Sequence, residues 1–152
     1  MTTTVQFYHL LHTTTEVAIP KLVERALGAG HRVLIWCAND SEKARLSDAL
    51  WSQNPASFLA HSDAESAQAP QSPIVLSLAE NPSNSADILV ITHGGIPAND
   101  AAYTKVLDVF DGMDDVATLA ARQRWKHYKE AQRALQYIKQ QPGGGWKIEG
   151  EG

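Results

Sequence analysis

Residues 32–37 read RVLIWC, and this stretch decides the class of fold that the sequence predicts. Its consecutive apolar side chains leave no polar face, so a strand built from them has to be covered on both sides. Such strands are typical of parallel sheets that carry helices on their faces. Similar apolar runs return in IVLSL (74–78) and DILVIT (87–92). The sequence therefore predicts an α/β protein with these three segments inside the sheet.

The segments around these strands alternate between strand and helix signals. VQFYHLL (5–11) is β-branched and aromatic, which favours a strand, and the segment 13–30 carries helix-capping residues and ends in glycines. Pro20 lies within that segment, so the regular helix either contains it or begins there. A helix at 39–51 is expected to be capped by Asp40. The expected order is β-α-β-α-β-β-α-α-β, with strands at 5–11, 32–37, 74–78, 87–92 and 134–140 and helices at 13–30, 39–51, 101–110 and 115–132.

Short links between alternating strands and helices favour a three-layer sandwich. We therefore expect a Rossmann-like α/β fold with a mostly parallel sheet of about five strands. The chain has 152 residues, of which 43% are hydrophobic, and this is enough apolar material for one packed core. We expect a single α/β domain over residues 1–142 and a glycine-rich C-terminal tail over residues 143–152. The polar, proline-bearing segment 62–73 is expected to be a surface loop.

The overall charge and the cysteine content restrict the class of protein. The formal net charge is −4, so the chain has no broad positive field of the kind that coats nucleic acid without sequence preference. Cys37 is the single cysteine, so no internal disulfide can form and a reducing compartment is favoured. No apolar run is long enough for a membrane span and no secretion signal is visible. We therefore expect a cytoplasmic protein that has no contact with a membrane.

The glycine patterns do not support a nucleotide site. A dinucleotide-binding fold needs Gly-x-Gly-x-x-Gly after its first strand, because glycines let the backbone approach the pyrophosphate. The segment in that place, LLHTTTEVAIP (10–20), contains no glycine. PGGGWK (142–147) lacks the Lys-Ser/Thr ending of a phosphate-binding loop and has no helix after it. The sequence thus predicts a Rossmann-like fold without the nucleotide-binding fingerprint.

Two histidines raise the alternative of a metal site. His9 and His12 form a His-x-x-His pair, but residues three apart on a strand point to opposite faces. Histidines in loops are therefore the favoured interpretation, and a small metal-dependent hydrolase stays open as an alternative. The other ligands that such a site would draw on are Asp40, His61 and His93.

Cys37 and an acidic cluster are two further candidates for chemistry. Cys37 at a strand end has the position of a nucleophile, but buried inert thiols are far more common. The acidic cluster has the oxygen ligands of a magnesium site, yet two of its members are better placed to cap a helix. We therefore predict no catalytic residue, no metal and no cofactor. The cluster comprises Asp108, Asp111, Asp114 and Asp115.

The stretch AARQRWKHYKEAQRAL (120–135) is the strongest functional signal. Helical periodicity gathers four of its cations within a sector of about 60°, with Trp125 at the edge of that sector. A stripe of isolated lysines is usually only a solvated helix face. Arginine, whose planar fork suits carboxylate or phosphate, and an adjoining apolar wall favour a binding surface instead. The four cations are Arg122, Lys126, Lys129 and Arg133, and the residues expected to face the core are Ala121, Tyr128 and Ala131.

Seven segments of the chain are recognisable together: FYHL, RVLIWCAND, LSDALWSQNPASFLAH, PIVLSLAENPSNSADILV, VFDGMDD, AARQRWKHYKEA and GGGWK. In the same order and at similar spacing, over nearly all of residues 5–147, they resemble the chi subunit of bacterial DNA polymerase III. The resemblance implies an accessory protein rather than an enzyme, with a Rossmann-like fold and no nucleotide-binding residues. It implies a psi subunit as partner, which tethers chi to the clamp loader. It also implies binding to the single-stranded DNA-binding protein, whose acidic C-terminal tail ends in aspartates and Pro-Phe with a free carboxylate.

The resemblance also implies roles for individual residues. Arg122 would hold the terminal carboxylate of the tail, while Trp125 and Trp51 would wall the pocket for its phenylalanine ring. Lys126 and Lys129 would face the aspartates. A phenylalanine tail needs these three elements, since its ring needs an apolar pocket and its charges need cations.

Phe58 would belong to a separate surface that meets psi, although plain burial in the core explains it equally well.

Two departures from the family pattern bear on the tail site. Thr118 stands one turn before Arg122, where some members carry a further cation. Gln132 and Arg133 replace a glycine that frequently follows the helix, which leaves the helix end open.

A second hypothesis is a direct single-stranded nucleic-acid-binding protein that uses the helix at 115–133. In that case Trp125 and Tyr128 would stack on bases while the cations follow phosphates. The negative net charge favours the adaptor, whose contact with single-stranded DNA is indirect. We expect the free chain to be a monomer, or a heterodimer with psi.

Overall fold

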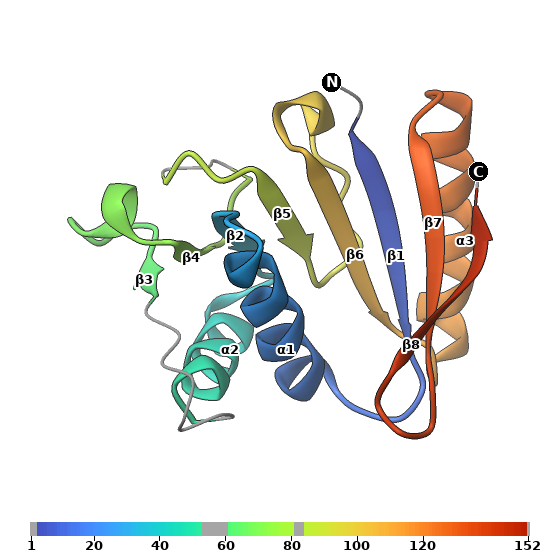
Figure 1. Ribbon diagram of the computed structural model, residues 1–152, viewed down its shortest axis with the longest axis horizontal. Coiled ribbons are helices and arrows are strands. Elements are labelled where there is room, and N and C mark those ends of the chain that lie inside the picture. The colour runs from blue at the N-terminus through green and yellow to red at the C-terminus, as the bar shows by residue number, and fades with distance from the viewer. Residues whose placement is uncertain (1–2, 53–60, 81–83, 152) are drawn as a thin grey trace.

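A computed structural model gives the structure of the protein and describes residues 3–80 and 84–151, apart from the segment 53–60. The described residues form an α/β fold with a single mixed sheet (Figure 1). The helices are α1 (Thr15–Gly28), α2 (Asp40–Ser52) and α3 (Asp115–Glu130), with short 3₁₀ turns at Ala69–Gln71 and Asp100–Ala102. The strands are β1 (Thr4–Leu10), β2 (Val33–Trp36), β3 (Ser62–Asp63), β4 (Ile74–Ser77), β5 (Ile88–Ile91), β6 (Lys105–Asp111), β7 (Ala134–Gln140) and β8 (Trp146–Glu151).

The strand order across the sheet is β3-β4-β2-β5-β6-β1-β7-β8. All neighbours are parallel except β7 and β8, which pair antiparallel. β2, the strand predicted from RVLIWC, pairs with β4 and β5, and every residue of those two neighbours is buried. The prediction of an α/β protein built on these three segments is confirmed.

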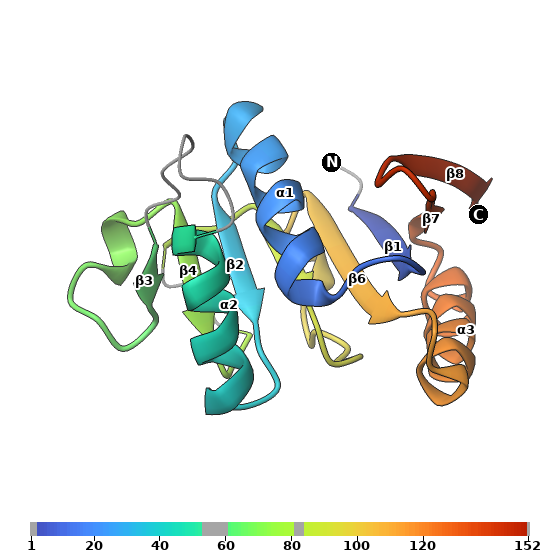
Figure 2. The same ribbon diagram turned by 90° about the horizontal axis from the view of Figure 1, so that it is seen from below.

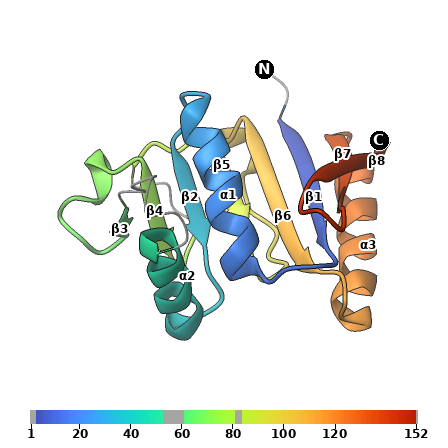
Figure 3. The same cartoon turned by 60° about the horizontal axis from the view of Figure 1, so that its bottom comes forward.

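Helices cover the two faces of the sheet at different ends. α1 and α2 share one core with alternate side chains of the strands, whereas α3 shares the other core. Figure 1 shows α1 and α2 in front of the sheet and α3 behind β7. In Figure 2 and Figure 3, α2 lies near the β4 end of the sheet and α3 near the β7 end. The two helices that carry the predicted site residues are therefore on opposite faces.

The prediction of a helix at 101–110 is wrong, because a 3₁₀ turn and the central strand β6 occupy this segment. β6 pairs with β5 on one side and β1 on the other. Asp108 interrupts the apolar run of KVLDVFD, but its carboxylate is buried against Arg124. Arg124 belongs to α3. The sequence around Asp108 therefore gives no sign that this aspartate is paired and can be buried in a strand.

The C-terminal segment that was predicted to be a tail contributes the edge strand β8. A tight turn connects it to β7, with Gly144 at a φ of 88°, where a side chain would be strained. The Gln141 amide donates to the Gly145 carbonyl and closes the turn. Trp146 packs edge-on against Tyr8 on the α1 side of the sheet.

The described sheet therefore has eight strands rather than about five, and it is partly antiparallel. β8 and the short strand β3, which lies in the segment predicted to be a loop, account for part of this difference. The helix that begins after Thr14 runs through Pro20, which is buried inside α1.

Candidate functional site

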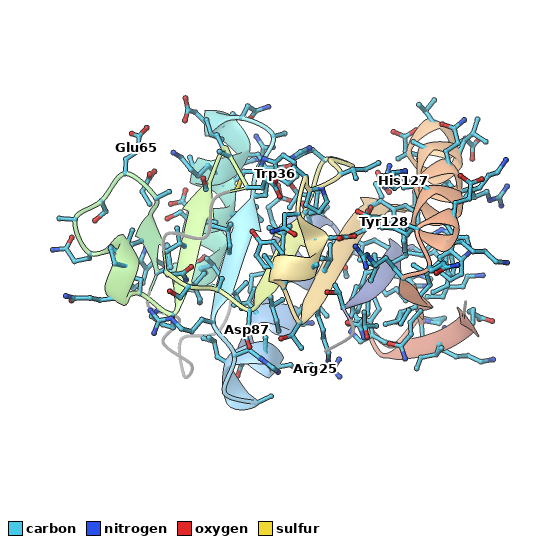
Figure 4. All side chains as sticks on the ribbon, turned by 90° about the horizontal axis from the view of Figure 1, so that it is seen from above. Arg25, Trp36, Glu65, Asp87, His127 and Tyr128 are labelled. Atoms are coloured by element: carbon cyan, nitrogen blue, oxygen red, sulfur yellow. The ribbon has the colours of Figure 1, made fainter. Side chains whose placement is uncertain are left out.

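Burial of one side of α3 determines which of its side chains face solvent. Asp114 caps the helix, its carboxylate accepting a hydrogen bond from the Val116 amide at 3.0 Å. Ala121 and Tyr128 are buried against the sheet, where α3 packs on β6, β1 and β7. Figure 4 labels Tyr128 together with the neighbouring, exposed His127. Residues on the opposite side of the helix are consequently exposed.

Arg124 belongs to the buried side of α3 and is not part of the cationic face. Its guanidinium donates to the Asp108 carboxylate through Nε at 2.6 Å and Nη2 at 2.9 Å. Burial raises the pKa of Asp108, and the adjacent guanidinium opposes that rise. Gly94 packs so closely that an added Cβ would lie 2.7 Å from Nη1 of Arg124. This arginine therefore has a structural partner on β6.

Arg133 also lies outside the predicted stripe, because α3 ends at Glu130. Its guanidinium donates to both carboxylate oxygens of Asp100, at 3.0 and 2.8 Å. Gln132 takes a φ of 61° just after the helix, a conformation that glycine adopts most easily. Ala131, which was predicted to face the core, is exposed at the end of the helix.

Arg122, Lys126 and Lys129 are exposed along α3. Within the described parts of the chain, none of the three forms an ion pair with an acidic side chain. Trp125 lies beside them, half-buried, with its ring centroid 5.5 Å from Phe7 and 6.0 Å from Tyr137. The structure therefore brings four of the predicted tail-binding residues together. We call the set formed by Arg122, Trp125, Lys126, Lys129 and Tyr137 the α3–β7 surface.

The electrostatics of His9 show that this surface reaches from α3 to β7. Its imidazole contacts the Tyr137 hydroxyl and stacks obliquely on Phe110, with ring centroids 4.9 Å apart. Burial lowers the pKa of His9, a hydrogen bond with the Gly112 backbone opposes this shift, and the positive charges of Lys139 and Arg122 lower the pKa further. A cation from α3 and a cation from β7 therefore act on the same ring.

Tyr137 is a further residue of this surface, and alternation along the strand at 134–140 is the sequence signal that points to it. Leu135 and Tyr137 pack on the α3 side of the sheet, so Lys139 lies on that side as well. Burial raises the pKa of Tyr137, while the charge of Arg122 lowers it. The phenol is thus a half-buried neighbour of the exposed arginine.

Trp51 is not brought to this surface. It lies in α2, whose buried residues belong to the core on the other face of the sheet. Its side chain is 49% exposed, and its ring centroid lies 4.6 Å from that of His61. Phe58, the residue proposed to meet psi, lies outside the described residues.

The candidate metal ligands are dispersed. The described residues contain no group of three or more His, Cys, Asp or Glu side chains arranged to hold a metal ion. Of the acidic cluster, Asp108 is paired with Arg124 and Asp114 caps α3. Cys37 is buried, which raises the pKa of its thiol to about 12 and disfavours the reactive thiolate. Among the described helices, none has the length and apolar character needed to span a membrane.

A comparison with protein families finds one match over most of the chain. Residues 1–136 match the family model described as DNA polymerase III chi subunit, HolC. The matched range contains the whole of α3 and ends within β7, so β8 lies beyond it. A comparison with curated proteins finds no match.

Proposed function

The chain belongs to the DNA polymerase III chi-subunit family, and on that premise we propose that it is a non-catalytic adaptor of the replisome. In this proposal the α3–β7 surface binds the acidic C-terminal tail of the single-stranded DNA-binding protein. A psi subunit links the adaptor to the clamp loader. The tail is expected to carry aspartates followed by a terminal phenylalanine, as the family resemblance implies.

The observation that supports tail binding is a set of exposed cations beside an aromatic wall. Arg122, Lys126 and Lys129 have no acidic partner in the described residues, and Trp125 is only half-buried next to them. A guanidinium can bind a carboxylate through two parallel hydrogen bonds. Each such bond contributes about 1.5–3 kcal/mol when desolvated and much less when exposed. Lysines along the helix suit a run of aspartates, whose positions they need not match in detail.

We propose a different pair of aromatic residues for the phenylalanine ring. Trp51 lies on the opposite face of the sheet, so Trp125 and Tyr137 are the aromatic side chains beside Arg122. Edge contacts of a phenyl ring with such side chains contribute about 0.5–1.5 kcal/mol beyond the buried area. We therefore assign the ring to the edge of this aromatic pair.

A second surface would bind psi. Trp51 is half-exposed at the end of α2, immediately before the segment that contains Phe58. An exposed tryptophan is a common anchor of protein interfaces. We assign Trp51, which lies on the face opposite the α3–β7 surface, to this second surface, to which the family resemblance also assigns Phe58.

The alternative of direct binding to single-stranded nucleic acid is less well supported. Tyr128, one of the two aromatic residues proposed to stack on bases, is fully buried with 0% exposure. Trp125 packs on Phe7 and Tyr137 and presents only part of its ring. A stacking platform needs exposed ring faces.

The test is a titration of the protein with a synthetic peptide that carries the acidic tail. We expect binding to weaken strongly when the terminal phenylalanine is deleted or its carboxylate is amidated. A single-stranded oligonucleotide alone should bind much more weakly than the peptide. If the oligonucleotide binds tightly and the peptide does not bind, the adaptor hypothesis is rejected in favour of direct binding to single-stranded nucleic acid.

A further inference from the structure

The hairpin of β7 and β8 places two lysines directly opposite each other. Lys139 pairs with Lys147 in the antiparallel register. Ile138, on the alternate position of β7, belongs to the core on the α1 side, whereas Tyr137 packs on the α3 side. Strand alternation therefore directs both lysines to the α3 side of the sheet, next to the α3–β7 surface.

Like charges directly opposite each other on neighbouring strands destabilise a sheet. Neither Lys139 nor Lys147 forms an ion pair with any acidic side chain in the described stretches of the chain. Glu149 lies two positions beyond Lys147 on β8, and its charge acts on Tyr137. The described residues thus give the lysine pair no direct acidic partner, and a bound anion would offset the repulsion expected between two like charges in this register.

The lysine pair is continuous with Arg122. Lys139 lies beside His9 in the parallel register of β1 and β7. The positive charges of Lys139 and Arg122 both lower the pKa of His9, so both cations are near enough to act on the same imidazole. A band of positive charge therefore runs from α3 across β7 to the edge strand.

We propose that Lys139 and Lys147 form a second cationic subsite, which binds aspartate carboxylates of the acidic tail while Arg122 holds the terminal carboxylate. The inference rests on the proposed function, because it concerns the same tail. It also goes beyond the family match, which ends at residue 136 and so includes neither lysine. An acidic peptide fits better than a nucleic acid, since Tyr137 and Trp125 are half-buried and pack on each other, whereas a platform for stacked bases needs exposed ring faces.

The experiment compares two peptides of equal length that both end in Pro-Phe with a free carboxylate. One carries the aspartates and the other carries asparagines in their place. The variants are K139Q/K147Q, R122A and the control K21Q/R25Q, which removes two exposed cations from α1. The control changes the net charge by the same amount as K139Q/K147Q but lies on the other face of the sheet.

We expect K139Q/K147Q to weaken binding of the aspartate peptide by about threefold to tenfold, as two partly exposed ion pairs would. The affinity of K139Q/K147Q for the asparagine peptide should stay within about twofold of that of the wild type. R122A should instead lower the affinity for both peptides. Free K139Q/K147Q should also melt at a higher temperature than the wild type at low salt, with the difference shrinking at high salt.

If K139Q/K147Q and K21Q/R25Q bind the aspartate peptide with equal affinity, the lysine subsite is rejected. The proposed tail binding still stands in that case if R122A lowers the affinity. A wild type that binds neither peptide would overturn both. Loss of oligonucleotide binding in K139Q/K147Q with unchanged peptide binding would make the lysine pair a phosphate site and would also overturn the inference.

Discussion

Arg124 donates two hydrogen bonds to the carboxylate of Asp108, and this buried pair joins α3 to the central strand β6. The side chains are 9% and 0% exposed, so neither charge has water as an alternative partner. Together with the packing of Ala121 and Tyr128, this contact holds α3 on the sheet. The structural arginine and the binding arginine are two residues apart on the same helix.

Removing one member of the pair should destabilise the fold strongly. Arg124→Met leaves the Asp108 carboxylate buried without a cation, and Asp108→Asn leaves the guanidinium without an anion. Each single variant is expected to lower the free energy of unfolding by about 3–5 kcal/mol in urea denaturation. The double variant should lose less free energy of unfolding than the two single variants lose together, because it leaves no unpaired charge. Losses below about 1 kcal/mol in both single variants would show that the pair does not anchor α3.

Arg122→Ala should weaken binding of the acidic tail peptide by at least about tenfold, because it removes the group proposed to hold the terminal carboxylate. Its free energy of unfolding should change by less than about 0.5 kcal/mol, since the side chain is exposed. Isothermal titration calorimetry measures the affinity. The control is Arg25→Ala, an exposed arginine of α1, which should leave the affinity unchanged. Unaltered binding by Arg122→Ala would reject the assignment.

Binding should also depend strongly on salt. The tail and its lysine partners are exposed, and exposed charges are screened over about 10 Å at 0.1 M ionic strength. Raising the salt concentration from about 0.05 M to about 0.5 M should therefore lower the affinity for the peptide severalfold. An affinity that stays constant over this range would indicate a mainly apolar interface around Trp125 and Tyr137.

The stability of the fold should fall as the pH drops through the ordinary pKa of histidine. Burial lowers the pKa of His9, and Lys139 and Arg122 lower it further. The unfolded chain therefore takes up a proton near pH 6.5 while the folded chain does not, so stability present above that pH is lost below it. Urea denaturation between about pH 7.5 and about pH 5.5 should show the loss, and His9→Gln should show a smaller slope. The lowered carboxyl pKa values of Glu16, Asp63 and Asp87 act at lower pH and do not produce this slope.

The same slope should shrink when the acidic tail is bound. Carboxylates placed beside Arg122 and Lys139 would offset the positive charge at His9 and raise its pKa. The measurement is a titration of the His9 ring signals by nuclear magnetic resonance with and without peptide. Identical titration curves would place the bound carboxylates away from this end of the surface.

The buried strands and the outer side of α3 were predictable because the signals are local. VLIW and IVLS have no polar face, and the 3.6-residue period separates Arg122 from Tyr128 without reference to the rest of the chain. Asp108 could not be placed in this way, since its partner Arg124 follows 16 residues later. Trp51, which the family resemblance assigns to the tail site, lies on the other face of the sheet for a related reason. Its aromatic character is visible in the sequence, but the face of the sheet that α2 covers depends on how the strands are ordered.

β8 shows a third limit of local patterns. Its glycines and alternating charges lower its strand propensity, so the segment resembles a tail when considered alone. Pairing with β7 and the packing of Trp146 on Tyr8 stabilise the strand. Lys147 acquires its position opposite Lys139 only through that pairing.

Gln132 provides a test of how the end of α3 is formed. Its φ of 61° is unfavourable for a residue with a side chain, and the family resemblance suggests glycine after this helix. Gln132→Gly should therefore raise the free energy of unfolding by about 0.5–1 kcal/mol, because relief of the left-handed strain exceeds the added entropy of the unfolded chain. The matched control is Gln123→Gly in the interior of α3, where glycine should destabilise by about 1 kcal/mol. Urea denaturation of the two variants should give opposite signs. Equal destabilisation by both would show that the conformation at Gln132 carries no strain.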